Sequence, residues 1–157
     1  MSRFRIDQTK EETPAAREVR HQFIGMRLGA EEYVIEIAKA REILMFEEIT
    51  YVPRVAGFIE GVINLRGDVV PVINLRSKLG MAADMPAATA RVIITESASG
   101  APVGLLVDAV TSVIRLPESS IGPATNAVGE VSVEYIKGIG RTEHSIVGWL
   151  DVDKLVA

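Results

Sequence analysis

Residues 57–80 read GFIEGVINLRGDVVPVINLRSKLG, and this stretch decides the fold class of the chain. Two near-identical apolar strings, at 62–66 and 72–76, flank a Gly-Asp pair at 67–68. β-Branched runs on both sides of a glycine-containing turn predict a β-hairpin. Neither string alternates cleanly between polar and apolar residues, so we expect both faces to be covered, as in a small closed barrel or a sandwich. Pro71 has no amide donor and predicts an edge, a strand start or a bulge.

The composition narrows the class of protein. The chain has 157 residues, 48% of them hydrophobic and 5% aromatic, which predicts one domain or two very small lobes with an aliphatic core. A net charge of −4 argues against nucleic-acid binding, because phosphate contacts need a surplus of Lys and Arg. Cysteine is absent, which excludes disulfides and thiol chemistry. No apolar run approaches the roughly 20 residues of a membrane span and no signal peptide is evident, so a cytoplasmic protein without membrane insertion is expected.

The remaining chain divides at changes in composition. Residues 1–20 are polar, mix both charges and predict a flexible tail. Alternating apolar residues predict a first lobe over 21–81, which begins with a hairpin and ends in a short helix. Small residues around a proline make 82–90 a connector. A second lobe is expected over 91–150, followed by a short helical tail at 151–157.

The second part of the chain repeats motifs of the first. The matched segments are 58–63 with 135–140, 69–75 with 146–152 and, at a slightly different spacing, 34–43 with 104–113. Val/Ile-rich strands can resemble one another by chance, but Gly61 and Gly138 stand in the same local context, which favours duplication. A repeat of about five short strands predicts two small β-barrels side by side. Because each lobe alone would have a marginal core, we expect them to share a hydrophobic seam.

No catalytic constellation is present in the sequence. His21 and His144 lie at a strand start and in a turn, without the spacing of a metal site. The acidic pairs are adjacent in sequence, so in a strand they point to opposite faces and form no acid–base dyad. There is neither a G-x-S-x-G elbow nor a glycine-rich phosphate loop. We therefore expect no enzyme activity, no metal and no cofactor, and we interpret the Arg-Gly-Asp at 66–68 as a hairpin tip.

One pair of charged residues stands out. Glu42 lies within the apolar segment 40–44, and Arg66 lies beside Gly67 at the tip of the central hairpin. They are either two solvated side chains or an ion pair that fixes the hairpin against a neighbouring strand. Because an exposed ion pair adds little stability, the second interpretation predicts a role in recognition.

These motifs resemble the CheW family, the adaptors of bacterial chemotaxis. The central similarity is GVINLRG at 61–67 with VPVINLR at 70–76. Further segments that resemble the family are 29–37, 40–43, 107–110 and 135–140. The resemblance implies a CheW-like domain over 21–157, mainly β, with two pseudo-repeated five-stranded SH3-like barrels around a shared hydrophobic core and a few short helices. It implies no catalysis.

The resemblance also implies partners. CheW-like adaptors join the cytoplasmic tips of chemoreceptors to the regulatory domain of the histidine kinase CheA, in receptor arrays under the inner membrane. The groove between the barrels contacts the receptor, and family members commonly have a larger aliphatic residue where Ala40 stands here. The Asn-Leu-Arg-Gly turn at 64–67 is counted among the candidate partner-binding residues, because the second lobe lacks this turn. The candidate partner-binding residues are Ala40, Glu42, Gly61, Asn64, Leu65, Arg66, Gly67, Gly104, Val110, Val113 and Gly138.

Two other readings of the sequence stay open. The same fold could act as a scaffold in another kinase pathway, such as motility or development, which the residues do not distinguish from chemotaxis. A β-barrel that binds a small ligand or nucleic acid is the other alternative, but the acidic charge and the few aromatic residues argue against it.

Overall fold

The computed structural model describes residues 20–46, 49–51, 57–82, 88–124 and 131–156. Their strands form two six-stranded sheets. The terminal sheet, named for strands from both ends of the chain, contains β1 (Arg20–Leu28), β2 (Glu31–Glu36), β9 (Ala109–Pro117), β10 (Ile121–Gly122), β11 (Ile136–Arg141) and β12 (Ile146–Leu150). The central sheet contains β3 (Glu42–Met45), β4 (Thr50–Tyr51), β5 (Ile59–Leu65), β6 (Asp68–Asn74), β7 (Arg91–Glu96) and β8 (Pro102–Val107).

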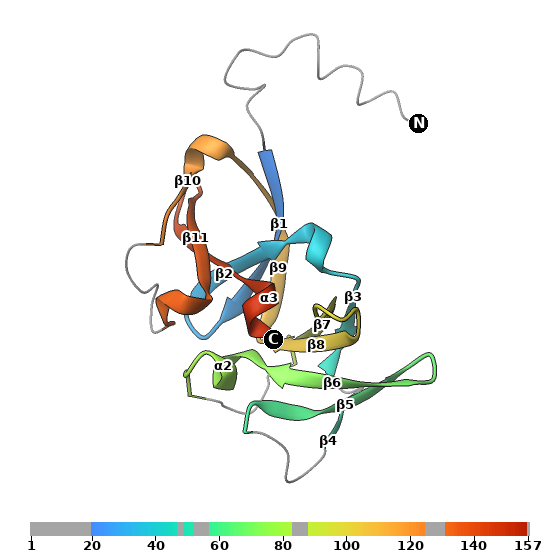
Figure 1. Ribbon diagram of the computed structural model, residues 1–157. Coiled ribbons are helices and arrows are strands. Elements are labelled where there is room, and N and C mark those ends of the chain that lie inside the picture. Colours follow the sequence, from blue (N-terminus) through green and yellow to red (C-terminus); the bar gives the residue numbers. More distant parts are fainter. Residues whose placement is uncertain (1–19, 47–48, 52–56, 83–87, 125–130, 157) are drawn as a thin grey trace.

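Helices are short and sit at the ends of strands. They are η1 (Ile37–Lys39), α2 (Leu75–Lys78), η3 (Glu118–Ser120), η4 (Val133–Tyr135) and α3 (Val152–Leu155). The terminal sheet lies above the central sheet in Figure 1, and both are curled. The prediction of a mainly β fold with a few short helices is confirmed, but each curled sheet has six strands where five were expected.

The two sheets exchange strands between the repeats. Their strand orders are β10-β11-β12-β2-β1-β9 and β3-β7-β8-β6-β5-β4. The hairpin β1–β2 therefore pairs with strands of the second repeat, and the hairpin β7–β8 pairs with strands of the first. The predicted lobes at 21–81 and 91–150 are wrong in strand membership, because the first hairpin of each repeat completes the sheet of the other.

The duplication itself is confirmed by equivalent details. β6 and β12 each lead into a four-residue helix whose N-cap side chain accepts a backbone N–H, Asn74 from Ser77 and Asp151 from Lys154. The same two cap residues donate their own backbone N–H to the carbonyls of residues 58 and 135, at 2.7 and 2.9 Å. The register of β5 on β6 and of β11 on β12 shifts at equivalent places. Under this equivalence the strand order of one sheet becomes that of the other.

The hydrophobic core is shared, as predicted. The largest buried cluster takes Ile24 and Tyr33 from the terminal sheet and Ile93 and Leu105 from the central sheet. A smaller cluster fills the inside of each curled sheet. In the terminal sheet, Trp149 packs edge-on against Phe23, with ring centroids 5.1 Å apart.

The central hairpin turns one residue earlier than predicted. Leu65 pairs with Asp68, so the loop is Arg66-Gly67 and not Gly67-Asp68. Both loop residues have positive φ, 51° and 92°, as a type I′ turn requires. This loop sets the register, so the two similar strings do not face each other and the second one runs into α2. Pro71 lies before the first pair of β6 with β8, which confirms a local edge.

An ion pair joins the two sheets. The Arg76 Nε in α2 donates to both carboxylate oxygens of Asp108, at 3.0 and 3.1 Å. Asp108 lies between β8 and β9, and its Oδ2 also accepts the backbone N–H of Gly29 in the β1–β2 turn, at 2.7 Å. Both charged side chains are half-buried. In the other repeat, Asp153 is equivalent to Arg76, and it pairs at 3.2 Å with Lys39, one residue after the equivalent of Asp108; the charges are reversed and both side chains are more exposed.

Asp108→Asn is predicted to destabilise the fold. Asparagine keeps an oxygen for the Gly29 N–H but removes the negative charge of Asp108 that faces the half-buried Arg76 guanidinium. We expect the free energy of unfolding to fall by about 1–3 kcal/mol in a urea titration. The matched control is Asp153→Asn, which breaks the exposed pair and should cost less than about 1 kcal/mol. Equal losses in the two variants would contradict the prediction that the Arg76–Asp108 pair contributes more to stability than the Lys39–Asp153 pair.

Candidate functional site

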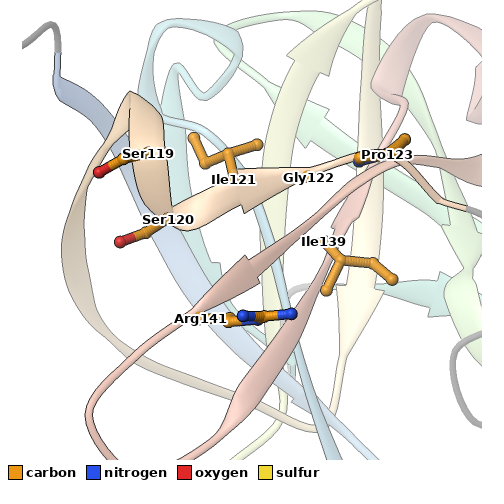
Figure 2. Close-up of a pocket in the computed structure, with 7 residues that line it drawn as sticks. All are labelled: Ser119, Ser120, Ile121, Gly122, Pro123, Ile139 and Arg141. Carbon is orange, nitrogen blue, oxygen red and sulfur yellow. The ribbon is translucent and has the colours of Figure 1, made fainter.

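The described residues offer no metal site, and one hollow among them has no acid–base pair. Within them, no cluster of three or more His, Cys, Asp or Glu side chains is placed to hold a metal ion. Figure 2 shows a hollow beside β10 in which the serine hydroxyls and the Arg141 guanidinium point in different directions. The hollow is lined by Ser119, Ser120, Ile121, Gly122, Pro123, Ile139 and Arg141. None of these side chains is a general base or a carboxylate, so the hollow offers a contact surface and no acid–base pair.

The predicted ion pair between Glu42 and Arg66 is present. The Arg66 Nη2 donates to the Glu42 Oε2, and the two side chains are 72% and 30% exposed. The hydrogen bond and the negative charge of Glu42 raise the pKa of the Arg66 guanidinium. β3 is one edge of the central sheet, while the β5–β6 turn belongs to strands beyond β7 and β8. The pair therefore connects distant strands of a curled sheet.

The turn around Arg66 is held from three sides. Asn64 Oδ1 accepts the backbone N–H of Gly67 at 3.0 Å. Leu65 packs on the cluster inside the central sheet. Gly67 supplies the second positive φ of the loop. The turn thus fixes the backbone and leaves the Arg66 side chain exposed to solvent.

Aliphatic candidates lie on the edge strands of both sheets. Ala40, just before β3, and Val110, on β9, pack partly buried against the shared core. Val113 on β9 is exposed. It pairs with Ile24 of the shared core, so it lies on the face of the terminal sheet that is directed toward that core.

Sequence reasoning missed two exposed residues on β3, Ile43 and Met45. Ile43 pairs with Ile93 of the shared core and so lies on the corresponding face of the central sheet. In the repeat that aligns 34–43 with 104–113, Ile43 is aligned with the candidate Val113. That alignment could have identified Ile43. No comparable signal marks Met45.

The three remaining glycines are explained by internal packing. A Cβ at Gly61 would lie 2.2 Å from the Thr50 carbonyl oxygen, and one at Gly138 would lie 3.0 Å from that of Gly122. These carbonyls belong to the equivalent strands β4 and β10. A Cβ at Gly104 would meet two valine methyl groups inside the central sheet, at 2.8 and 3.2 Å. All three glycines are buried and shape the site from below the surface.

Comparison with known proteins decides the family. A family model described as a CheW-like domain matches residues 22–157. The chain belongs to the CheW-like family. No helix of the described part of the chain is long and apolar enough to cross a membrane.

Relatives share the family over most of their length. A protein named chemotaxis protein CheW from Klebsiella aerogenes is 34% identical over 91% of this chain and 86% of its own length. The protein of the same name from Thermotoga maritima is 33% identical, over 86% and 87%. A solved structure, the scaffolding protein TtCheW from Thermoanaerobacter tengcongensis, superposes with a TM-score of 0.80 at 31% identity, covering 87% of this chain and 92% of that one.

Gly61→Ala is predicted to lower stability, because the new methyl group would have to displace the Thr50 backbone. We expect a loss of about 1–3 kcal/mol and a lower Tm in a thermal melt. Gly57→Ala is the control, since a Cβ at Gly57 would meet nothing within 4 Å. If the two variants melt at the same temperature, close approach of β4 is not the reason for glycine at 61.

Proposed function

We propose that this chain is a non-catalytic adaptor that couples chemoreceptor tips to the regulatory domain of the histidine kinase CheA, in receptor arrays on the cytoplasmic side of the membrane. The observation that carries the proposal is the exposed Arg66 guanidinium, held by Glu42 on a locked turn within a CheW-like domain. The pair is too exposed to add much stability, so a role in recognition is the better explanation for it. Relatives named as chemotaxis proteins and a scaffolding protein support the same assignment.

The receptor surface is proposed to follow the edge strands. β3 carries Glu42 on one face and Ile43 on the other, so a helix that approaches this edge meets a charge and an aliphatic side chain together. Ala40, Val110 and Val113 supply further apolar contact beside the shared core. An amphipathic receptor helix can bury its apolar stripe there, while the Glu42–Arg66 pair fixes the register of that helix along the edge.

A second type of contact is proposed at the hairpin tips. Val69 on β6 and Ile146 on β12 stand at equivalent positions of the repeat and are 69% and 59% exposed. The two hairpins extend to opposite sides of the molecule in Figure 1. A bridging protein needs partners on two sides, and duplicated exposed side chains suit that role. Each contact is small, so the strength of an array would come from many contacts in parallel.

Arg66→Asn tests the receptor surface. Asn-Gly is a preferred type I′ turn pair, so the variant removes the guanidinium while it keeps the backbone conformation. We expect the Tm to change by less than about 2 °C and the affinity for a purified receptor tip to fall about tenfold or more in calorimetry. Arg66→Lys, which keeps the charge, should retain more of the affinity. A lower Tm with unchanged affinity would assign Arg66 to the fold alone.

Val69→Asp and Ile146→Asp test the hairpin tips. Each places a charge on an exposed apolar position, so each should weaken binding to the CheA regulatory domain by about tenfold in calorimetry, with receptor-tip affinity unchanged. Val133→Asp is the control, because Val133 is exposed on η4, which leads into β11 at the end away from the hairpin tip. Wild-type protein that binds neither the regulatory domain nor the receptor tip would refute the adaptor role. Kinase binding without receptor binding would assign the chain to another pathway.

A further inference from the structure

One face of the terminal sheet continues beyond the shared core. Ile24 of β1 is buried in that core and pairs with the exposed Val113 on the edge strand β9. Because side chains alternate along a strand, Arg20 and Gln22 lie on the same face as Ile24, and Arg115 lies on the same face as Val113. Gln22 pairs with Arg115, and these two side chains and Arg20 are exposed. In Figure 1 β1 and β9 run on together past η1, where this uncovered part of the face lies.

We call Arg20, Gln22 and Arg115 the basic extension. It carries two positive charges without a counter-charge. Within the part of the chain that the structure describes, neither arginine makes an ion pair or a side-chain hydrogen bond. An exposed arginine presents a planar fork of donors that matches a carboxylate. The basic extension therefore suits a partner with acidic side chains.

Two carboxylates near the basic extension are paired with other residues. Glu36 pairs with Phe23 across β1 and β2, so it lies on the opposite face of the sheet, where Lys137 is 3.7 Å away. Glu118 follows β9 and contacts the His21 ring at 2.8 Å. These carboxylates do not take the place of an acidic partner at the two arginines.

Aliphatic side chains border the basic extension. Ile37 of η1 is exposed and lines the same hollow as Arg20 and Gln22. On β9, Val113 lies two residues before Arg115 on the same face, and it belongs to the proposed receptor surface. The face thus joins apolar contact to positive charge, which fits one side of an amphipathic helix that has acidic residues beside its apolar stripe.

We propose that the basic extension selects the receptor. It continues the receptor surface from Val113 and binds carboxylates of the same receptor helix. This inference rests on the proposed adaptor function and adds the chemistry of the helix that this chain prefers. Two residues along a strand span about 6.8 Å, slightly more than one helical turn of about 5.4 Å. A helix that follows β9 therefore meets Arg115 about one turn after its contact with Val113.

Charge reversal tests the basic extension in the full chain. Arg115→Glu should weaken binding to a purified receptor tip by about tenfold in calorimetry at low salt. Raising NaCl from about 50 to 500 mM should reduce this difference, because salt screens exposed charges. Arg20→Glu should act in the same direction. The matched control is Arg141→Glu on β11, an exposed arginine beside the hollow of Figure 2, several strands away in the same sheet, and it should leave the tip affinity unchanged.

A charge swap identifies the partner group. Each Asp and Glu of the receptor tip is changed to Lys in turn. One of these changes should restore the affinity for Arg115→Glu and weaken the affinity for the wild-type chain. A loss that is equal at every salt concentration and that no swap restores would come from altered structure, and would overturn the proposal.

The remaining outcomes separate this proposal from the adaptor role. If Arg115→Glu and Arg20→Glu bind the tip as tightly as wild type while Arg66→Asn binds weakly, the basic extension has no part in receptor binding and the adaptor role stands. If Arg115→Glu instead abolishes co-sedimentation with phosphatidylglycerol vesicles and keeps its tip affinity, the face binds lipid and the proposal is overturned. Wild-type protein that does not bind the tip would refute both.

Discussion

The structure depends on the pairing of each repeat's first hairpin with strands of the other repeat. The parallel pairs β2–β12 and β6–β8 allow two similar halves to build two sheets, each completed by the other. The shared core and the Arg76–Asp108 pair follow from this arrangement, because both lie where the exchanged hairpins meet the rest of the chain. A chain of this size gains from the exchange, since two separate small barrels would each bury too little apolar surface.

The sequence predicted those parts of the fold that depend on neighbouring residues. A glycine next to β-branched runs identified the central hairpin, and matched segments around Gly61 and Gly138 identified the duplication. Strand partners far apart in sequence were not predictable, because a short run of Val and Ile fits many neighbours equally well. That is why β1 and β2 were assigned to the wrong lobe. The turn was misplaced by one residue because arginine rarely adopts a positive φ, as Arg66 does.

The candidate site was predictable where a charged residue stood in an unusual sequence context. Glu42 in an apolar segment and Arg66 at a tip indicated a pair, and the structure contains it. The glycines were assigned to the same site, but the Thr50 carbonyl beside Gly61 and the valines around Gly104 give them a packing role. Asp108, within the family-like segment 107–110, was given no role, since a single acid between two apolar strands does not indicate its tertiary contact. In the candidate site, the charged side chains are thus exposed for contact, and the glycines allow the close packing beneath them.

The position of the indole ring has a practical consequence. Trp149 is the one tryptophan of the chain, and it lies on β12 while its aromatic neighbours Phe23 and His21 lie on β1. Lys137 also lies over the ring, 5.1 Å from its centroid. Indole emission changes with the polarity and the charges around the ring. The fluorescence of Trp149 therefore reports whether β12 is packed with β1, and the protein carries its own optical probe of folding.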